Sequence, residues 1–313
     1  MHSRKLATCI LSICLCGLIG ARVAWAQKTA EKPKAYESKV VKQTTKKPKS
    51  AEKKKHFIRV TRDKKGTPLS LQTAIVSYEK GKGDNKVTVY LVGAVHIGDR
   101  AYYRQLNREF EKYDVVLYEL VAPKGTRIER GSRSTSTFNT LARKLLKLDT
   151  QVARIDYTKK NFVHADMSAK DMKEAMKNRG DDPLSVALRV ASDMMRQQNK
   201  RMNGKGKPIP RISLFTLLAD PKRHLKLKRI MAEEFASEET SSGLGETLNV
   251  MLIDDRNKVA MQVFDKELKK KKYKSIAIFY GAAHLPDFDK RLRKNYGFKQ
   301  KKIEWFTAWD LED

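Results

Sequence analysis

The chain has 313 residues, with 66 Lys and Arg against 36 Asp and Glu, so its formal net charge is +30. Hydrophobic residues make up 40% of the chain, enough for a sizeable core, which excludes wholesale disorder. Three cysteines are too few for a disulfide scaffold or a multi-cysteine zinc module. A polytopic membrane protein is also excluded, because the chain has only one long uncharged apolar segment.

That segment lies at the N-terminus and has the pattern of a secretory signal peptide. A basic start at residues 2–5 precedes the 16 uncharged residues 6–21, a run shorter than the ~20 residues of a membrane span. Residues 24–26, Ala-Trp-Ala, then form a small-x-small cleavage site. We therefore expect export to the periplasm, the cell surface or the medium after cleavage near Ala26. The alternative is an uncleaved N-terminal anchor.

The three cysteines, Cys9, Cys14 and Cys16, all lie inside this apolar segment. Cleavage near Ala26 would remove them together with the segment. The mature protein then contains no thiol, so the sequence excludes cysteine catalysis in the mature protein.

Residues 27–56 form a Lys-rich stretch with almost no large apolar side chains. Such a stretch cannot bury enough surface to offset chain entropy, so we expect a disordered linker. Its simplest role is that of a solvated spacer, and the alternative is adhesion to an anionic cell-surface polymer or lipid. The rest of the chain is also net basic and should attract anionic partners. No aromatic-spaced nucleic-acid motif is present, so we expect no nucleic acid partner.

From residue 57 on, the pattern indicates one α/β domain, residues 57–313. Alternating and continuous apolar runs predict strands at 57–61, 69–78, 87–92, 114–120, 275–280 and 302–309. Helical periodicity predicts helices at 99–113, 168–179, 183–202, 213–235, 248–269 and 286–295. The strand–helix–strand order over residues 87–120 is typical of a parallel crossover. We predict a mixed central sheet flanked by helices, with a helical insertion at about 134–240.

Two of the expected strands end in the same short motif. Residues 93–96 and 281–284 both read Gly-Ala-x-His, and a third apolar strand ends at Glu119. Because open α/β sheets bind ligands at the carboxyl ends of their strands, we expect His96, Glu119 and His284 to lie together. Two imidazoles and a carboxylate are common ligands of a divalent metal ion, which would activate water. The alternative is that either histidine is an ordinary loop residue.

The helix expected at 248–269 carries charged residues near its buried face. At 100° per residue, one apolar face is formed by Leu248, Leu252, Val259 and Val263. This face includes Asp255 and has Arg256 at its edge. Because buried charges cost free energy unless they are paired or functional, we expect Arg256 to hold a substrate carboxylate or an oxyanion, oriented by Asp255. The alternative is a structural ion pair.

In this order, the motifs resemble the TraB/GumN family, whose animal relatives are the Tiki proteins. The resemblance covers about residues 87–310 and is carried by Gly93–His96, Glu119, Asp255-Arg256-Asn257 and Gly281–His284. It implies an α/β fold of the Tiki/TraB type, distantly similar to erythromycin esterase and the haem-binding ChaN proteins. It also implies a metal-dependent protease with Mn²⁺- or Co²⁺-type ions, Zn²⁺ being a further option. One departure is that the family often has Glu where this chain has Asp255.

The sequence as a whole predicts an exported metal-dependent hydrolase that acts on a peptide or another small substrate. Its expected metal ligands are His96, His284 and Glu119, and its expected catalytic residues are Glu119, Arg256 and Asp255. The alternative function is a non-enzymatic protein that binds haem or a small anion through the same histidines. His164 and Asp166, expected on one face of a strand, are weaker candidates for support of the site.

Overall fold

The structure is a computed structural model, and it describes residues 57–126, 128, 145–200, 220–236 and 249–312. The expected signal peptide and linker, residues 1–56, lie outside this part of the chain. The elements belong to one compact unit, His56–Asp313. In chain order they are β1 (Ile58–Arg62), β2 (Pro68–Lys80), η1 (Gly83–Asn85), β3 (Val87–Ala94), β4 (Ile97–Gly98), α2 (Arg100–Phe110), β5 (Val115–Tyr118), β6 (Asp149–Thr150), α4 (Gln151–Arg154), β7 (Phe162–His164), α5 (Ala169–Asn178), α6 (Pro183–Lys200), α8 (Arg223–Ala236), η3 (Val250–Asp254), α11 (Asp255–Lys269), β8 (Ser275–Gly281), η4 (Ala282–His284), α12 (Leu285–Lys294) and β9 (Lys299–Asp310).

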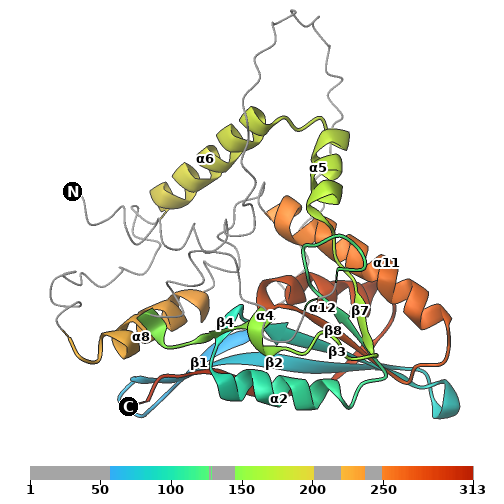
Figure 1. The fold of residues 1–313 in the computed structure, drawn as a ribbon, viewed down its shortest axis with the longest axis horizontal. Coiled ribbons are helices and arrows are strands. Elements are labelled where there is room, and N and C mark those ends of the chain that lie inside the picture. The colour runs from blue at the N-terminus through green and yellow to red at the C-terminus, as the bar shows by residue number, and fades with distance from the viewer. Residues whose placement is uncertain (1–56, 127, 129–144, 201–219, 237–248, 313) are drawn as a thin grey trace, which may run out of the picture. The chain divides into compact units, whose positions relative to one another are not determined.

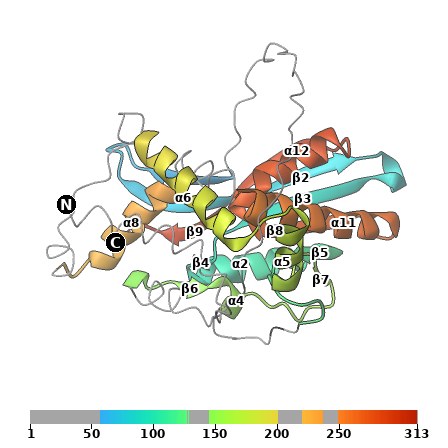
Figure 2. The ribbon, with the colours of Figure 1, turned by 90° about the horizontal axis from the view of Figure 1, so that it is seen from above.

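The central sheet is mixed, as the sequence predicts. Its described strands run in the order β1-β2-β3-β8-β5-β7, and β9 pairs with β2. The pairs of β2 with β1, β3 and β9 are antiparallel. The strands β3, β8, β5 and β7 are parallel to one another and can be followed in Figure 2. The carboxyl ends of these four strands therefore meet at one edge of the sheet.

The expected crossover from β3 through α2 to β5 is present, but the two strands are not neighbours. β8 lies between them. Its Ile278 pairs with Leu91 of β3 on one side and with Leu117 of β5 on the other. A strand from late in the chain thus separates two strands from early in the chain. This arrangement brings the two Gly-Ala-x-His motifs onto adjacent strands.

Helices cover both faces of the parallel strands (Figure 1). α2 packs against one face, which Ala277 and Phe279 of β8 also line. α11 and α12 pack against the other face with Ile276, Ile278 and Tyr280 of the same strand. A strand buried on both sides has a continuous apolar sequence, which is why Ser275–Gly281 is recognisable as a strand.

The described residues of the segment expected as a helical insertion, about 134–240, are only partly helical. Its described residues include α5, α6 and α8, but also β7, which is the last strand in the order of the central sheet. β7 is only three residues long and its side chains are half-buried, so it has no strong strand pattern. The prediction for α5 is confirmed, including the capping box between Ser168 and Asp171.

The helix expected at 248–269 begins with a turn of π-helix. The described part consists of the π-helix η3, Val250–Asp254, followed by α11 from Asp255. None of the helices in the described ranges is long and apolar enough to cross a membrane.

Candidate functional site

Three of the side chains singled out by the sequence converge where β3, β5 and β8 end. A Cβ atom placed on Gly281 would lie 3.4 Å from Glu119 Oε2, 3.7 Å from His284 Cδ2 and 3.8 Å from His96 Nε2. All three side chains therefore come within 4 Å of one point, which the glycine leaves empty. Glu119 and His284 are buried, whereas His96 is exposed at the edge of the site.

The Glu119 carboxylate is held by one backbone and one side-chain donor. Gly281 N–H donates to Oε2 at 2.7 Å, and Arg256 Nη2 donates to Oε1 at 2.5 Å. Burial by itself would raise the pKa of Glu119, but the adjacent Arg256 guanidinium outweighs it and holds that pKa well below the usual range. Glu119 is therefore a fixed, ionised carboxylate.

Arg256 is buried between two carboxylates. Its Nε and Nη2 donate to Asp166 at 3.0 Å and 2.7 Å, and Nη2 also reaches Glu119. Nη1 faces the Leu252 carbonyl oxygen at 3.4 Å. Burial opposes the charge of Arg256, but the two carboxylates raise its pKa above the ordinary value. With two carboxylates and one guanidinium, this cluster of Glu119, Arg256 and Asp166 has a net charge of about −1.

Asp255 does not orient Arg256 as the sequence analysis expects. Its carboxylate bonds to Arg179, which follows α5, and to Lys258 at 3.2 Å, so it belongs to a different group of ion pairs from Arg256. Asp166, which follows β7, takes the expected role. The difference arises because the π-helix η3 changes the angular phase of the residues around it.

The ring of His284 is fixed by Asn257. His284 Nδ1 lies 2.7 Å from Asn257 Oδ1, while Asn257 Nδ2 donates to His284 O at 3.2 Å and to Asp287 Oδ2 at 2.9 Å. The amide nitrogen must be the atom that faces two acceptors, so Asn257 Oδ1 accepts from His284 Nδ1–H. His284 Nε2 therefore carries a lone pair. Burial lowers the pKa of His284 to about 3, so the ring is neutral at ordinary pH.

The lone pair on His284 Nε2 faces Glu119 Oε1 at 3.6 Å. Both atoms are acceptors and both side chains are buried. Two facing acceptors repel each other unless a proton or a cation lies between them. The net negative charge of the neighbouring cluster also favours a cation at this position.

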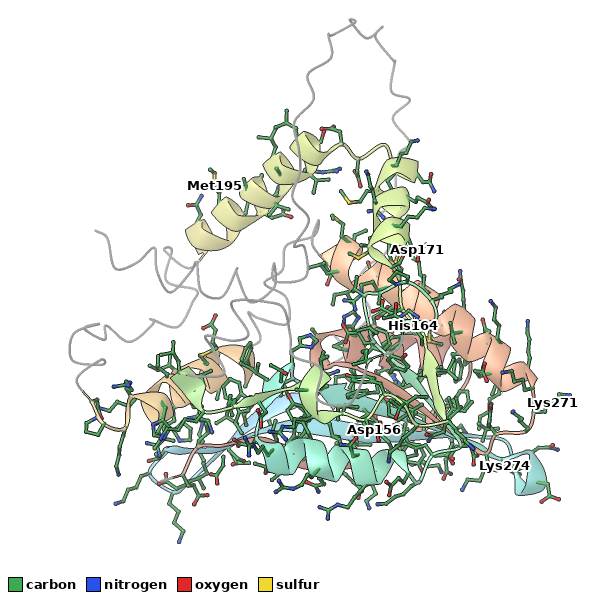
Figure 3. All side chains as sticks on the ribbon, viewed as in Figure 1. Asp156, His164, Asp171, Met195, Lys271 and Lys274 are labelled. Atoms are coloured by element: carbon green, nitrogen blue, oxygen red, sulfur yellow. The ribbon has the colours of Figure 1, made fainter. Side chains whose placement is uncertain are left out.

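His164 and Asp166 have different partners although only one residue separates them. β7 ends at His164, whose Nε2 donates to the Leu120 carbonyl oxygen at 2.6 Å. Its Nδ1 is buried and has no hydrogen-bond partner among the described residues. Asp166 lies beyond the strand and reaches Arg256. Figure 3 labels His164 near β7, below α11.

Two contacts of this site could not be assigned from the sequence. Asn257 belongs to the motif that carries the family resemblance, but nothing in the sequence assigns it to His284, because the contact joins residues 27 positions apart. Asp166 was only a weak candidate, because the sequence gives no sign that it faces Arg256, 90 positions away. An Arg and an Asn on the buried side of one helix are the signal that could have found both contacts.

The fold and the site together define an α/β protein with a buried Glu–Arg–Asp cluster and two histidines at the carboxyl edge of its sheet. No family model, no curated protein and no solved structure matches the chain. In the part of the chain that is described, no three or more His, Cys, Asp and Glu side chains lie close enough together to hold a metal ion as they stand.

Proposed function

We propose that the protein is an exported, metal-dependent hydrolase of the peptidase type. The observation that carries this proposal is the pair of facing acceptors, His284 Nε2 and Glu119 Oε1, beside a cluster with net negative charge. Such a pair is stable when a cation bridges it. The export of the protein rests on the signal-peptide pattern of residues 1–26.

Two of the donors at this edge, His284 and Glu119, have the chemistry and the spacing to share a divalent ion. His284 presents the tautomer that metal-binding histidines adopt, with the other ring nitrogen held by a fixed acceptor. The 3.6 Å between its Nε2 and Glu119 Oε1 is close to the ~3.4 Å that separates two ligands of one tetrahedral ion with bonds of ~2.1 Å. His96 Nε2 would be the third donor, since its exposed ring is near the same point.

A divalent ion held by His96, His284 and Glu119 would lower the pKa of bound water and polarise a peptide carbonyl. The other residues would position this set. Arg256 and the Gly281 amide fix the Glu119 carboxylate, and Asn257 fixes the His284 ring. The donors of Arg256 are already bonded inside the protein. Positioning of the Glu119 carboxylate is therefore a better supported role for Arg256 than the expected contact with an oxyanion.

The TraB/GumN resemblance supports the same proposal. The residues that carry it at His96, Glu119, Arg256-Asn257 and His284 belong to one site. The finer expectation of a Tiki/TraB-type fold also belongs to this proposal. The alternative of a bound anion is less favoured, because the buried cluster is itself negative.

Metal binding by the full-length protein tests the proposal. We would measure bound Mn²⁺, Co²⁺ and Zn²⁺ by elemental analysis and thermal unfolding for the wild type, H96A and H284A, with H224A as a histidine control from α8. An ion at a hundredfold excess over its Kd should raise Tm by roughly 5–10 °C in the wild type and H224A. H96A, which replaces an exposed side chain, should fold normally and lose most of this shift.

Hydrolysis of a quenched-fluorescence peptide library would complete the test. Turnover that requires the ion and is lost in H96A supports the proposal. If none of the three ions binds and H96A matches the wild type in every assay, the proposal is wrong. A Soret band on haem titration that disappears in H284A, without turnover, would select the haem-binding alternative.

A further inference from the structure

A second group of metal-capable side chains lies outside the site described above. Four methionines, Met167, Met172, Met176 and Met251, line one small pocket, and Arg179 and Asp255 complete its wall. The cavity volume is about 10 Å³, close to the space one water molecule needs. The pocket is thus large enough for a single atom or ion and too small for an organic ligand.

The four thioethers come from two separate parts of the fold. Met172 and Met176 lie four residues apart on α5, so they share one face of that helix. Met167 precedes the helix, and Met251 belongs to the π-helix η3. Figures 1 and 2 both show α5 beside the start of α11, and Figure 3 labels Asp171 in the first turn of α5.

The exposure of these methionines suits a site that can be filled from solution. Met167 and Met251 are buried, whereas Met172 and Met176 are half-buried. The two charged groups at the wall are already paired, because Asp255 bonds to Arg179 and to Lys258. The carboxylate is therefore not an open ligand for a hard divalent ion, and the chemistry of the pocket is that of its thioethers.

Thioether sulfur is a soft, polarisable ligand that selects Cu(I) over Mg²⁺, Ca²⁺ and Mn²⁺. We propose that the methionine pocket binds one soft monovalent ion, Cu(I), for which Ag(I) is a chemical substitute. The π-helix supports a functional role, since single π-turns inside helices are frequent at functional sites. This site is independent of the proposed hydrolase site, whose donors are imidazole and carboxylate.

Simple packing is the competing explanation, because methionine readily fills irregular gaps in a core. The two explanations differ in what replacement by leucine does. Leucine has a similar volume and is tolerated where packing alone matters, but it has no sulfur. A methionine-to-leucine change therefore preserves a packed core and removes a thioether site.

The test is an anaerobic Cu(I) titration of the full-length chain against a chromophoric Cu(I) chelator. Cys9, Cys14 and Cys16 are changed to serine in every variant, because their thiolates would bind Cu(I) more tightly than thioethers. We expect one Cu(I) per chain, at least a tenfold weaker affinity in M172L/M176L, and no change in M261L, whose methionine packs in a different cluster. X-ray absorption should show sulfur neighbours around the copper.

Two results would overturn the proposal. One is an affinity for Cu(I) and Ag(I) that is the same in M172L/M176L as in the starting protein, while circular dichroism shows both to be folded. The other is Cu(I) binding that survives M172L/M176L but is lost in H96A, which would place the ion in the His–Glu site. Neither result would contradict the hydrolase proposal.

Discussion

Asp166 accepts two hydrogen bonds from Arg256, from Nε at 3.0 Å and from Nη2 at 2.7 Å, and both residues are buried. Arg256 in turn donates to Glu119. Asp166, which follows the edge strand β7, therefore positions the carboxylate of Glu119, which follows β5. It does so through Arg256. Removing this link should cost stability as well as any function of Glu119.

We expect Asp166→Asn to lower the free energy of unfolding by about 3 kcal/mol, because it leaves a buried guanidinium with one charged partner fewer. Asp255→Asn is the matched control. The Arg179 side chain that pairs with Asp255 is 31% exposed, and such pairs contribute at most about 1 kcal/mol. Urea unfolding of both variants measures the difference. Equal losses would contradict the assignment of Asp166 as the partner of Arg256.

The pKa of His284 predicts how stability depends on pH. Burial lowers this pKa to about 3 in the folded protein, from the usual 6.5. Below pH 6.5 the unfolded chain therefore binds a proton that the folded protein does not, so acid favours unfolding. The contribution of His284 is complete above pH 6.5 and falls by about 1.4 kcal/mol per pH unit as the pH drops towards 3.

His284→Gln should remove this slope between pH 6.5 and 5. Glu119 does not interfere in that window, because its pKa is lowered from 4.5 and its contribution is lost only below that value. Urea unfolding at pH 7, 6 and 5 gives the slope for both proteins. A wild-type slope that His284→Gln leaves unchanged would mean that another group binds the proton.

Much of the sheet is predictable because its strands have strong local patterns. β3 is an apolar run that ends in Gly93-Ala94, and β8 is one that ends in Gly281; both predictions are confirmed. The place of β8 between β3 and β5 is not predictable in this way. The pairing of Thr88 with Ser275 joins residues far apart in the sequence, and no local pattern specifies such a contact.

The prediction that Asp255 orients Arg256 is wrong for a local reason. It assumes 100° per residue through the whole segment, but η3 is a π-helix with more residues per turn. The buried side of α11 instead consists of Arg256, Asn257, Ala260, Met261, Phe264 and Glu267, while Val259 and Val263 are half-buried. A sequence pattern cannot indicate this change of phase, because η3 is built from the same kinds of residue as an ordinary helix.

Asn257 provides a test of the metal proposal that does not remove a ligand. Asn257→Leu takes away the acceptor of His284 Nδ1–H, so the ring can rotate or change tautomer. We expect the affinity for the divalent ion to fall about 10- to 100-fold, as it does when an outer partner of a metal-bound histidine is lost. Calorimetric titration gives the affinity, and ¹⁵N NMR of the histidine rings gives the tautomer. Unchanged affinity alongside a changed tautomer would exclude His284 as a ligand.

Alanine in place of the first glycine of each Gly-Ala-x-His motif should have different effects. At Gly281 it should weaken ion binding, and at Gly93 it should lower the stability of the fold. On Gly281 a methyl group meets only ordinary contacts of 3.4 Å or more, but it fills the point at which Glu119, His284 and His96 converge. We expect Gly281→Ala to change stability by less than about 1 kcal/mol and to weaken ion binding and hydrolysis at least tenfold.

On Gly93 a methyl group would lie 3.2 Å from the Ala74 carbonyl oxygen and 3.1 Å from Leu285 Cδ2. The backbone oxygen belongs to β2 and cannot easily move, so Gly93→Ala should destabilise the fold by about 1–3 kcal/mol through overpacking. Urea unfolding and ion titration of the two variants separate the effects. If Gly281→Ala folds and binds the ion as tightly as the wild type, the space in front of Gly281 is not where the ion binds, and the hydrolase proposal loses its site.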